Sequence, residues 1–261
     1  MSTTYVNNFS SSPPPTLSHD ELYPSPYDVN FAYPILEDVL QTPRLKLVPF
    51  LPAVHGEAYW EQVKDRLDLF KYYGSVNHSL ESFLTWLELT QRRHPYHCSF
   101  AVVDRTRPDP ARPALGGSLA GHLALTNAIP GDLVTEIAYV VVFPAFQHTH
   151  VAKEMVGLLL RYALQLPGAA PPGCGLRRVE WRAHPDNGPS IGTAKRMGFR
   201  WEGEFKYARV LPEELAYVGD RGRPGDPADG RPARRTTILS VCWDDWEEGG
   251  VKELVDAVLN K

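Results

Sequence analysis

The sequence predicts an α/β domain in which helices flank a central β-sheet. Its 261 residues are 43% hydrophobic, which is enough apolar material for one sizeable core and, at this length, for one domain with extensions. Short β-branched segments alternate with longer segments of helical periodicity, as expected for helices packed on a sheet. Residues 136–143 show this best, because an apolar strand stopped by Pro144 is followed by an amphipathic helix at 151–165.

The elements follow in order from a first strand in which polar and apolar residues alternate before Pro49. Ser79 is placed to cap a helix that Pro95 stops, and Gly198 is placed to end another. A Pro/Arg loop at 105–113 indicates a hairpin between the strands on either side. The predicted strands are 44–48, 99–104, 118–125, 136–143, 178–183, 204–211 and 235–243, and the predicted helices are 57–70, 80–93, 151–165 and 189–197.

Composition divides the chain into three segments. Residues 1–40 are predicted to be a Ser/Pro-rich N-terminal arm, because the run Ser11-Ser12-Pro13-Pro14-Pro15 and further prolines interrupt backbone hydrogen bonding. The folded domain is expected at 41–247 and a C-terminal helical tail at 248–261. We find no internal repeat.

Charge and cysteine content disfavour several classes of protein. The formal net charge of −4 lacks the basic excess of a nucleic-acid or anionic-membrane surface, so neither partner is expected. The three cysteines have neither disulfide nor zinc-ligand spacing, which fits reduced thiols in the cytoplasm. No apolar run approaches a membrane span, and the start resembles no targeting peptide. We therefore expect a cytoplasmic protein.

The junction between the strand at 136–143 and the helix at 151–165 is a candidate anion site. Such a turn directs unpaired backbone N–H groups along the positive end of a helix dipole, an arrangement that holds a pyrophosphate. On geometry alone, an ordinary strand-to-helix connection explains it equally well.

The wider motif pattern resembles the GCN5-related N-acetyltransferase (GNAT) family, in particular its ribosomal-protein-acetyltransferase branch, across roughly residues 42–246. The resemblance implies a GNAT fold: a mixed, mostly antiparallel sheet with two splayed parallel strands, flanked by helices. It also implies acetyl transfer from acetyl-CoA to a primary amine, on a small molecule or a protein N-terminus. The motifs that carry it are Thr42-Pro43-Arg44-Leu45, Glu136-Ile137-Ala138, Pro144-Ala145-Phe146-Gln147, Asn187, Ser190, Lys195, Met197-Gly198-Phe199, Glu202-Gly203, Arg235-Thr236-Thr237, Ser240 and Trp243 to Trp246.

The resemblance also implies where the cofactor binds. Pantetheine amides are expected along the central strand, and pyrophosphate on the backbone amides from His148 to Lys153, with Thr149 and Lys153 as side-chain helpers. His150 stands where the family usually has glycine, and a side chain there could restrict backbone approach to phosphate. We interpret it as a subgroup character. The expected cofactor-binding residues are Val140, Val141, Val142, Gln147, His148, Thr149, His150, Val151, Ala152, Lys153, Asn187 and Ser190.

Two residues are candidates for the chemistry. An amine must lose a proton before it attacks a thioester, and Glu136, at the head of an apolar strand, could accept that proton directly or through water. The alternative for Glu136 is a surface carboxylate or an arginine pair. Ser190 could protonate the leaving thiolate, with Tyr139 and Tyr207 as weaker choices, or it could simply cap its helix.

Other interpretations stay open. A catalytically silent CoA-binding module is the first, because of His150, and an RNA- or ribosome-associated factor using the arginines between 219 and 235 is the second. A metal site is not expected, since the pair His148 and His150 lacks acidic neighbours in sequence. The acceptor and the oligomeric state are not determined, and a homodimer is compatible with the sequence. Five aromatic residues suggest an acceptor pocket, although core packing explains them equally: Phe70, Tyr72, Tyr73, Phe83 and Trp86.

Overall fold

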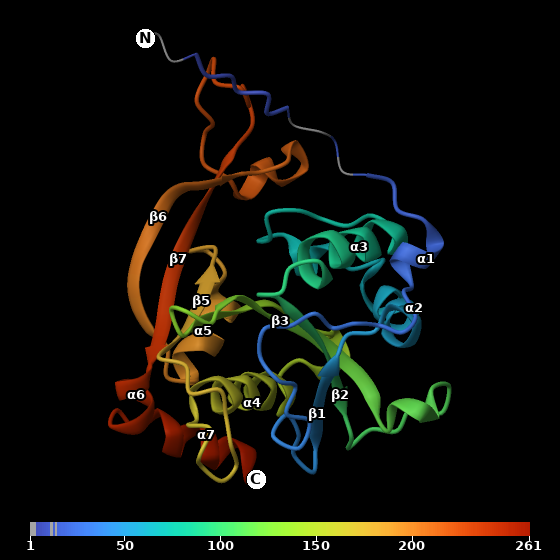
Figure 1. Ribbon diagram of the computed structural model, residues 1–261, viewed down its shortest axis with the longest axis vertical. Coiled ribbons are helices and arrows are strands. Elements are labelled where there is room, and N and C mark those ends of the chain that lie inside the picture. Colours follow the sequence, from blue (N-terminus) through green and yellow to red (C-terminus); the bar gives the residue numbers. More distant parts are fainter. Residues whose placement is uncertain (1–3, 11–12, 14) are drawn as a thin grey trace.

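The chain forms one seven-stranded sheet flanked by helices, as seen in a computed structural model that describes residues 4–10, 13 and 15–261 (Figure 1). The strand order is β1-β2-β3-β4-β5-β7-β6, and only β4 and β5 pair in parallel. This confirms the predicted fold class. The strands are β1 (Leu45–Pro49), β2 (Cys98–Asp104), β3 (Ser118–Ile129), β4 (Val134–Val142), β5 (Arg178–Ala183), β6 (Arg200–Val210) and β7 (Ala233–Cys242).

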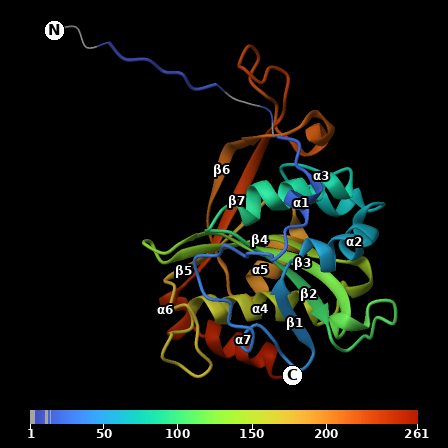
Figure 2. The same ribbon diagram turned by 45° about the vertical axis from the view of Figure 1, so that its right-hand side comes forward.

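Helices cover both faces of the sheet (Figures 1 and 2). α2 and α3 lie on one face, and α4 and α7 lie on the other, where they contact each other. Leu158, Leu159 and Leu160 of α4 are all fully buried, because this helix packs between the sheet and α7. The helices are α1 (His19–Leu22), α2 (Pro52–Val63), α3 (Leu80–Leu87), α4 (Val151–Leu164), α5 (Gly188–Arg196), α6 (Trp243–Glu247) and α7 (Val251–Leu259).

α2 and α3, the first two helices predicted from the sequence, differ from their predicted ranges. α2 begins at Pro52, earlier than expected, because proline suits the first helical turn, and it ends at Val63; a short 3-10 helix, Leu67–Phe70, follows it. α3 has the predicted cap, in which the Ser79 hydroxyl accepts a hydrogen bond from the Ser82 amide. It then changes into a π-helical turn, Glu88–Arg92, which no periodicity signal marked.

The N-terminal segment contributes more to the core than its composition predicts. Leu17, Leu22 and Leu40 are buried, and Ser18 caps α1 through a capping box. These apolar residues are too widely spaced to give a periodic signal. Within the proline run, Ser11, Ser12 and Pro14 lie outside the described residues, and the division at residue 40 stays a prediction.

β4 and β5 separate shortly after they meet. They pair only from Val134 with Arg178 to Glu136 with Glu180, after which β5 continues beside β7 alone. Tyr139 has a positive φ of 52°, and the pairing of β4 with β3 shifts register in the same region. In the part of the chain that the structure describes, the β5-facing edge of β4 beyond Glu136 has no strand partner, which leaves hydrogen-bonding groups for a ligand.

The connection between β6 and β7, residues 211–232, has local structure of its own. It contains a 3-10 helix, Glu213–Val218, and a bridge between Asp220 and Ala233. Of the arginines noted between residues 219 and 235, Arg234 and Arg235 lie in β7, where the sequence predicted only the second of them. Among the described residues, no helix has both the length and the apolar composition needed to cross a bilayer.

Candidate active site

The unpaired edge of β4 offers amides more than carbonyls. Phe143 donates its amide to Ala120 in β3, and since alternate residues point to opposite edges, Val140 and Val142 direct their polar groups into the splay. Two side chains already occupy their carbonyls. The Tyr73 hydroxyl donates to Val140 at 3.0 Å, and the Gln147 amide donates to Val142 at 3.1 Å. The edge therefore retains N–H donors for an incoming acceptor.

A buried histidine supports the irregular backbone at Tyr139. His122 Nδ1 lies 3.2 Å from the Tyr139 carbonyl oxygen, and its ring lies among Phe50, Tyr59 and Trp86. Burial lowers the pKa of His122 to about 4, so its ring is neutral at physiological pH and Nδ1 carries the proton it donates. Sequence reasoning assigned no role to this residue.

The turn before α4 presents free backbone donors. In the described chain, the amides of Thr149, His150, Ala152 and Lys153 have no protein acceptor, while the Val151 amide makes a long contact of 3.4 Å with the Thr149 hydroxyl. That hydroxyl also donates to the Phe146 carbonyl at 2.6 Å, so it stabilises the turn itself. Four free amides at the start of a 14-residue helix are the kind of donors that an anion site needs.

The glycine-like position of this turn is His148, not His150. His148 has a φ of 61°, in the left-handed region that favours glycine, whereas His150 has an ordinary helical φ of −67°. The His150 ring is 18% exposed, and its Nε2 lies 3.6 Å from Oδ1 of the fully buried Asp104 at the end of β2. The absence of glycine at position 150 therefore imposes no backbone strain.

Glu136 lies where β4 and β5 part. The residue is 8% exposed, and its Oε2 accepts a hydrogen bond of 3.1 Å from the side-chain amide of Asn127. Arg182 of β5 is 3.5 Å away but makes a closer contact, 2.8 Å, with Glu180. Burial raises the pKa of Glu136, with nearby Glu180 adding to the effect and Arg182 opposing it. The arginine pair considered from the sequence is thus present, but it does not neutralise the effect of burial.

Ser190 and Asn187 lie at the start of α5. The Asn187 side chain caps this helix by accepting from the Ser190 amide at 3.3 Å, so the cap is Asn187 rather than Ser190. The Ser190 hydroxyl accepts from the Trp181 indole at 3.0 Å. Its own proton has no protein acceptor among the described residues.

Comparison with known proteins adds to this geometry. A family model described as an acetyltransferase (GNAT) domain matches residues 44–200. The chain belongs to the GNAT acetyltransferase family. Members of this family use acetyl-CoA. No curated protein matches the chain in sequence.

Solved structures of other acetyltransferases share the fold. A GCN5-related N-acetyltransferase from Brucella melitensis has a TM-score of 0.63 and 24% identity, with 84% of this chain and 83% of that chain covered. Mycobacterium smegmatis RimJ, in complex with CoA-disulfide, has a TM-score of 0.58 and 17% identity, covering 82% and 90%. Spermidine N-acetyltransferase from Vibrio cholerae, in complex with CoA and spermine, has a TM-score of 0.54 and 13% identity, covering 78% and 98%.

The aromatic residues suggested from the sequence separate in this acetyltransferase. Tyr73 and Trp86 both contact Tyr139, with ring centroids 6.2 and 4.8 Å away, so they lie beside the irregular part of β4. Phe83 is buried in the core, and Tyr72 stacks on His184 at 5.1 Å. Core packing is therefore the correct explanation for Phe83.

Four residues near Glu136 were absent from the sequence-based candidates for this site. Asn127 and Arg182 contact its carboxylate directly. The charge of Arg209 lowers the pKa of Glu136, and the charge of Glu136 raises the pKa of Arg234. The alternation of charge at Arg178, Glu180 and Arg182 was the one readable signal, because residues two apart on a strand share a face. The others come from distant segments.

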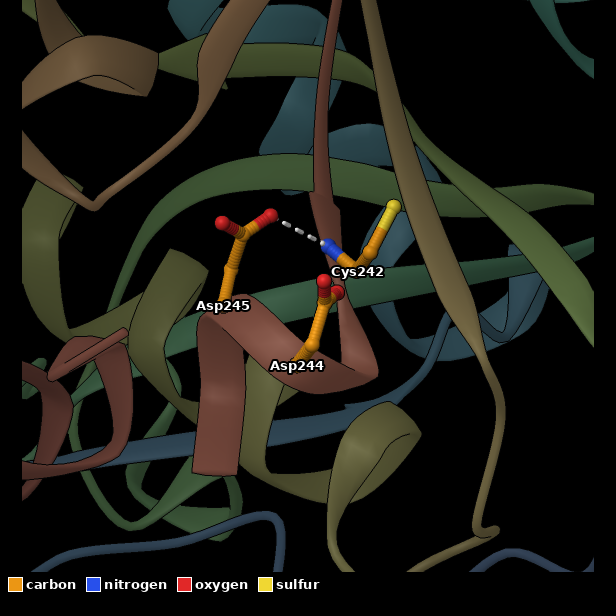
Figure 3. A group of neighbouring side chains, drawn as sticks. All are labelled: Cys242, Asp244 and Asp245. Atoms are coloured by element: carbon orange, nitrogen blue, oxygen red, sulfur yellow. Dashed lines mark hydrogen bonds between the residues drawn. The ribbon is translucent and has the colours of Figure 1, made fainter. Parts of the chain in front are cut away.

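One cluster of potential metal ligands lies outside this site (Figure 3). Cys242, Asp244 and Asp245 gather at the start of α6. Asp245 accepts a hydrogen bond from the Cys242 amide at 3.0 Å and pairs with Arg200 at 2.9 Å. Helix capping and this ion pair account for the arrangement.

Proposed function

We propose that this protein is an acetyl-CoA-dependent N-acetyltransferase in which Glu136 accepts the proton of a primary amine. The observation that carries the proposal is the position of Glu136: a buried carboxylate at the point where β4 leaves β5, beside a strand edge with free amides. Burial raises the pKa of Glu136 toward the range in which a carboxylate works as a general base. The family's use of acetyl-CoA supplies the other half of the argument.

Two sets of free donors support a place for the cofactor. Amides of Val140 and Val142 suit the pantetheine chain, and the amides between Thr149 and Lys153 suit the pyrophosphate. Acetyl-CoA bound in this way would carry its thioester along the β4 edge toward Glu136. Asn187 caps α5, the helix that carries Ser190.

The reaction then needs one bond made and one broken. The neutral amine attacks the thioester carbon, its proton passes to Glu136 directly or through water, and a tetrahedral intermediate forms. When the carbon–sulfur bond breaks, the thiolate takes a proton relayed from solvent through the Ser190 hydroxyl. The carboxylate finally releases its proton to water, which restores the starting state.

The acceptor substrate in this proposal is a primary amine, either of a small molecule or of a protein N-terminus. The resemblance of the motifs to the ribosomal-protein-acetyltransferase branch favours an N-terminal amine, and the solved relative bound to spermine acts on a polyamine. Acceptor specificity on a shared fold depends on side chains of the site, such as Asn127 and Arg182, which contact Glu136.

A thioester-consumption assay over a panel of amines, with CoA binding measured in parallel, tests the proposal. CoA binding is expected to raise the melting temperature, because a ligand that binds only the folded state stabilises it by mass action. Tight CoA binding with no turnover on any amine would favour a silent CoA-binding module. A saturating CoA titration without a thermal shift would remove both interpretations.

A further inference from the structure

Two arginines on the last hairpin face the same side of the sheet without a carboxylate partner. Arg209 in β6 is directly opposite Arg234 in β7, and opposed residues of an antiparallel pair project from the same face. Among the described residues, no Asp or Glu lies within ion-pair distance of either guanidinium, whereas Arg235, on the opposite face, pairs with Asp220 at 3.0 Å and Glu204 at 3.5 Å. Two facing cations repel each other, and Glu136, whose charge acts on both, lies beyond ion-pair distance of either guanidinium.

Hydrogen bonds hold Arg234 in place. Its Nε donates to the Tyr72 carbonyl at 3.2 Å, and its Nη1 donates to the Thr236 hydroxyl at 2.6 Å. Burial lowers the pKa of Arg234, and the neighbouring Arg209 lowers it further. The guanidinium is therefore fixed and partly desolvated, which strengthens any bond to an anion at its remaining nitrogen.

Arg209 packs on a bare stretch of backbone. A Cβ atom at Gly74 would lie 2.6 Å from Arg209 Nη1, so the absence of a side chain at position 74 makes room for the guanidinium. Both arginines thus contact the segment Tyr72–Gly74. Within it, the Tyr73 hydroxyl donates a hydrogen bond to the Val140 carbonyl of β4, and the Tyr73 ring stacks on Tyr139. The pair is connected through one short segment to the strand edge beside Glu136.

We infer that Arg209 and Arg234 bind an anionic group of the acceptor, so that the preferred substrate is a primary amine that also carries a carboxylate or a phosphate. The anion would supply a counter-charge at contact distance, and the amine would extend toward Glu136 past Tyr73 and Tyr139. This inference rests on the proposed acetyltransferase function for the fate of the amine, although the anion site can be measured without turnover. A polyamine, which carries only positive charge, would be disfavoured.

Matched pairs of compounds test the site. In the protein saturated with CoA, calorimetry would compare L-phenylalanine with L-phenylalaninamide, and phosphoethanolamine with ethanolamine, so that the two pairs separate a carboxylate from a phosphate. We expect one acid to bind at least about tenfold more tightly than its neutral partner, the usual scale for hydrogen bonds to a charged group. Acetylation of the same four amines gives kcat/KM for each, which should follow the same order.

Three variants and one control connect the preference to the arginines. Arg209→Gln and Arg234→Gln should each lower affinity for the acid about tenfold or more and leave the neutral partner unchanged. Arg234→Lys keeps a positive charge and should retain part of the preference. Arg235→Gln removes a charge from the same strand but from its other face, so it should leave the preference intact. CoA binding by each variant reports that it is folded.

The outcomes separate this inference from the proposed function. Arginine-dependent binding of an acid without acetylation of any amine would leave the anion site standing and remove the proposed activity. Acetylation of the neutral amines as efficiently as the acids, unaffected by Arg209→Gln or Arg234→Gln, would overturn the anion site and leave the activity standing. Equal loss of acid and neutral binding in the arginine variants would also overturn the anion site.

Discussion

The two ends of the β4 edge are built in different ways. At the α4 end, the free donors are backbone amides of a continuous segment, residues 149–153, fixed by the start of one helix. At the Glu136 end, the polar groups are side chains from separate segments, among them Asn127, Arg182 and Arg234. The first end depends on backbone shape and the second on which side chains meet.

This difference explains which substitutions each end tolerates. Backbone amides point at a ligand whatever side chains follow them, so His150 can occupy the place of a family glycine while its ring is directed at Asp104. Side chains at the other end set charge and pKa individually, and a single change there alters the chemistry.

The largest effect is expected at the side-chain end, with Glu136→Gln. The variant keeps shape and hydrogen-bonding capacity but loses basicity, so turnover at neutral pH should fall about 100-fold or more, with partial recovery at higher pH as free amine accumulates. CoA affinity, which depends on the other end, should change little. Steady-state rates across pH, with CoA binding measured separately, provide the check. Wild-type turnover with an unchanged pH profile would make Glu136 structural.

A companion variant, Glu180→Gln, tests whether the rate follows the ionisation of Glu136. The charge of Glu180 contributes to the raised pKa of Glu136, and its removal also frees Arg182 to pair with Glu136. Both changes lower the pKa of Glu136, so the rising limb of kcat/KM should move to lower pH. A profile that stays in place would assign that limb to another group.

A smaller effect is expected at the backbone end, with Ala152→Pro. Proline removes one free amide in the first turn of α4, where its ring is tolerated, so CoA affinity should fall about tenfold, the scale of one hydrogen bond to a charged group. The matched control is Ala152→Ser, which keeps the amide. Calorimetry gives the affinities and thermal unfolding the stability. If both variants bind CoA equally, the phosphates lie elsewhere.

A pair of glycine substitutions locates the position of backbone strain. His148→Gly should stabilise the fold by about 1 kcal/mol, because glycine adopts the left-handed conformation without the steric cost of a Cβ. His150→Gly should destabilise it by roughly 1–3 kcal/mol, since buried Asp104 loses a polar neighbour. Urea unfolding measures both. The reverse order would restore position 150 as the glycine site.

The smallest effect concerns stability against pH. The folded-state pKa of Glu136 is raised, so its contribution to stability is fully present below the unfolded pKa and is lost as pH rises through the folded pKa. Glu136→Gln removes that loss, so its free energy of unfolding relative to wild type should increase with pH. Urea unfolding at pH values between about 4 and 8 tests this. A constant difference would mean that Arg182 and Asn127 offset the effect of burial.

The order of the elements and the family could both be predicted from the amino-acid pattern. Strand 178–183 was predicted with its observed bounds, and the helix predicted at 151–165 ends within one residue of the end of α4. A strongly periodic apolar pattern can bury its apolar face in only one secondary structure. Boundaries were less well predicted where no pattern distinguishes α-helix from the 3-10 and π turns around Phe70 and Glu88. Glu136 and the turn before α4 were identifiable because each lies within a continuous motif.

The surroundings of those residues depend on how distant segments pack together. Asn127, Arg182, Arg209 and Arg234 reach the β4 edge only because the sheet order places β3, β5, β7 and β6 around it, and no spacing in the sequence records such a meeting. Likewise, the His150 ring lies beside Asp104, which is 46 residues earlier in the chain. Pairings over such distances follow from packing and chain topology, whereas periodicity describes only neighbours within a few residues.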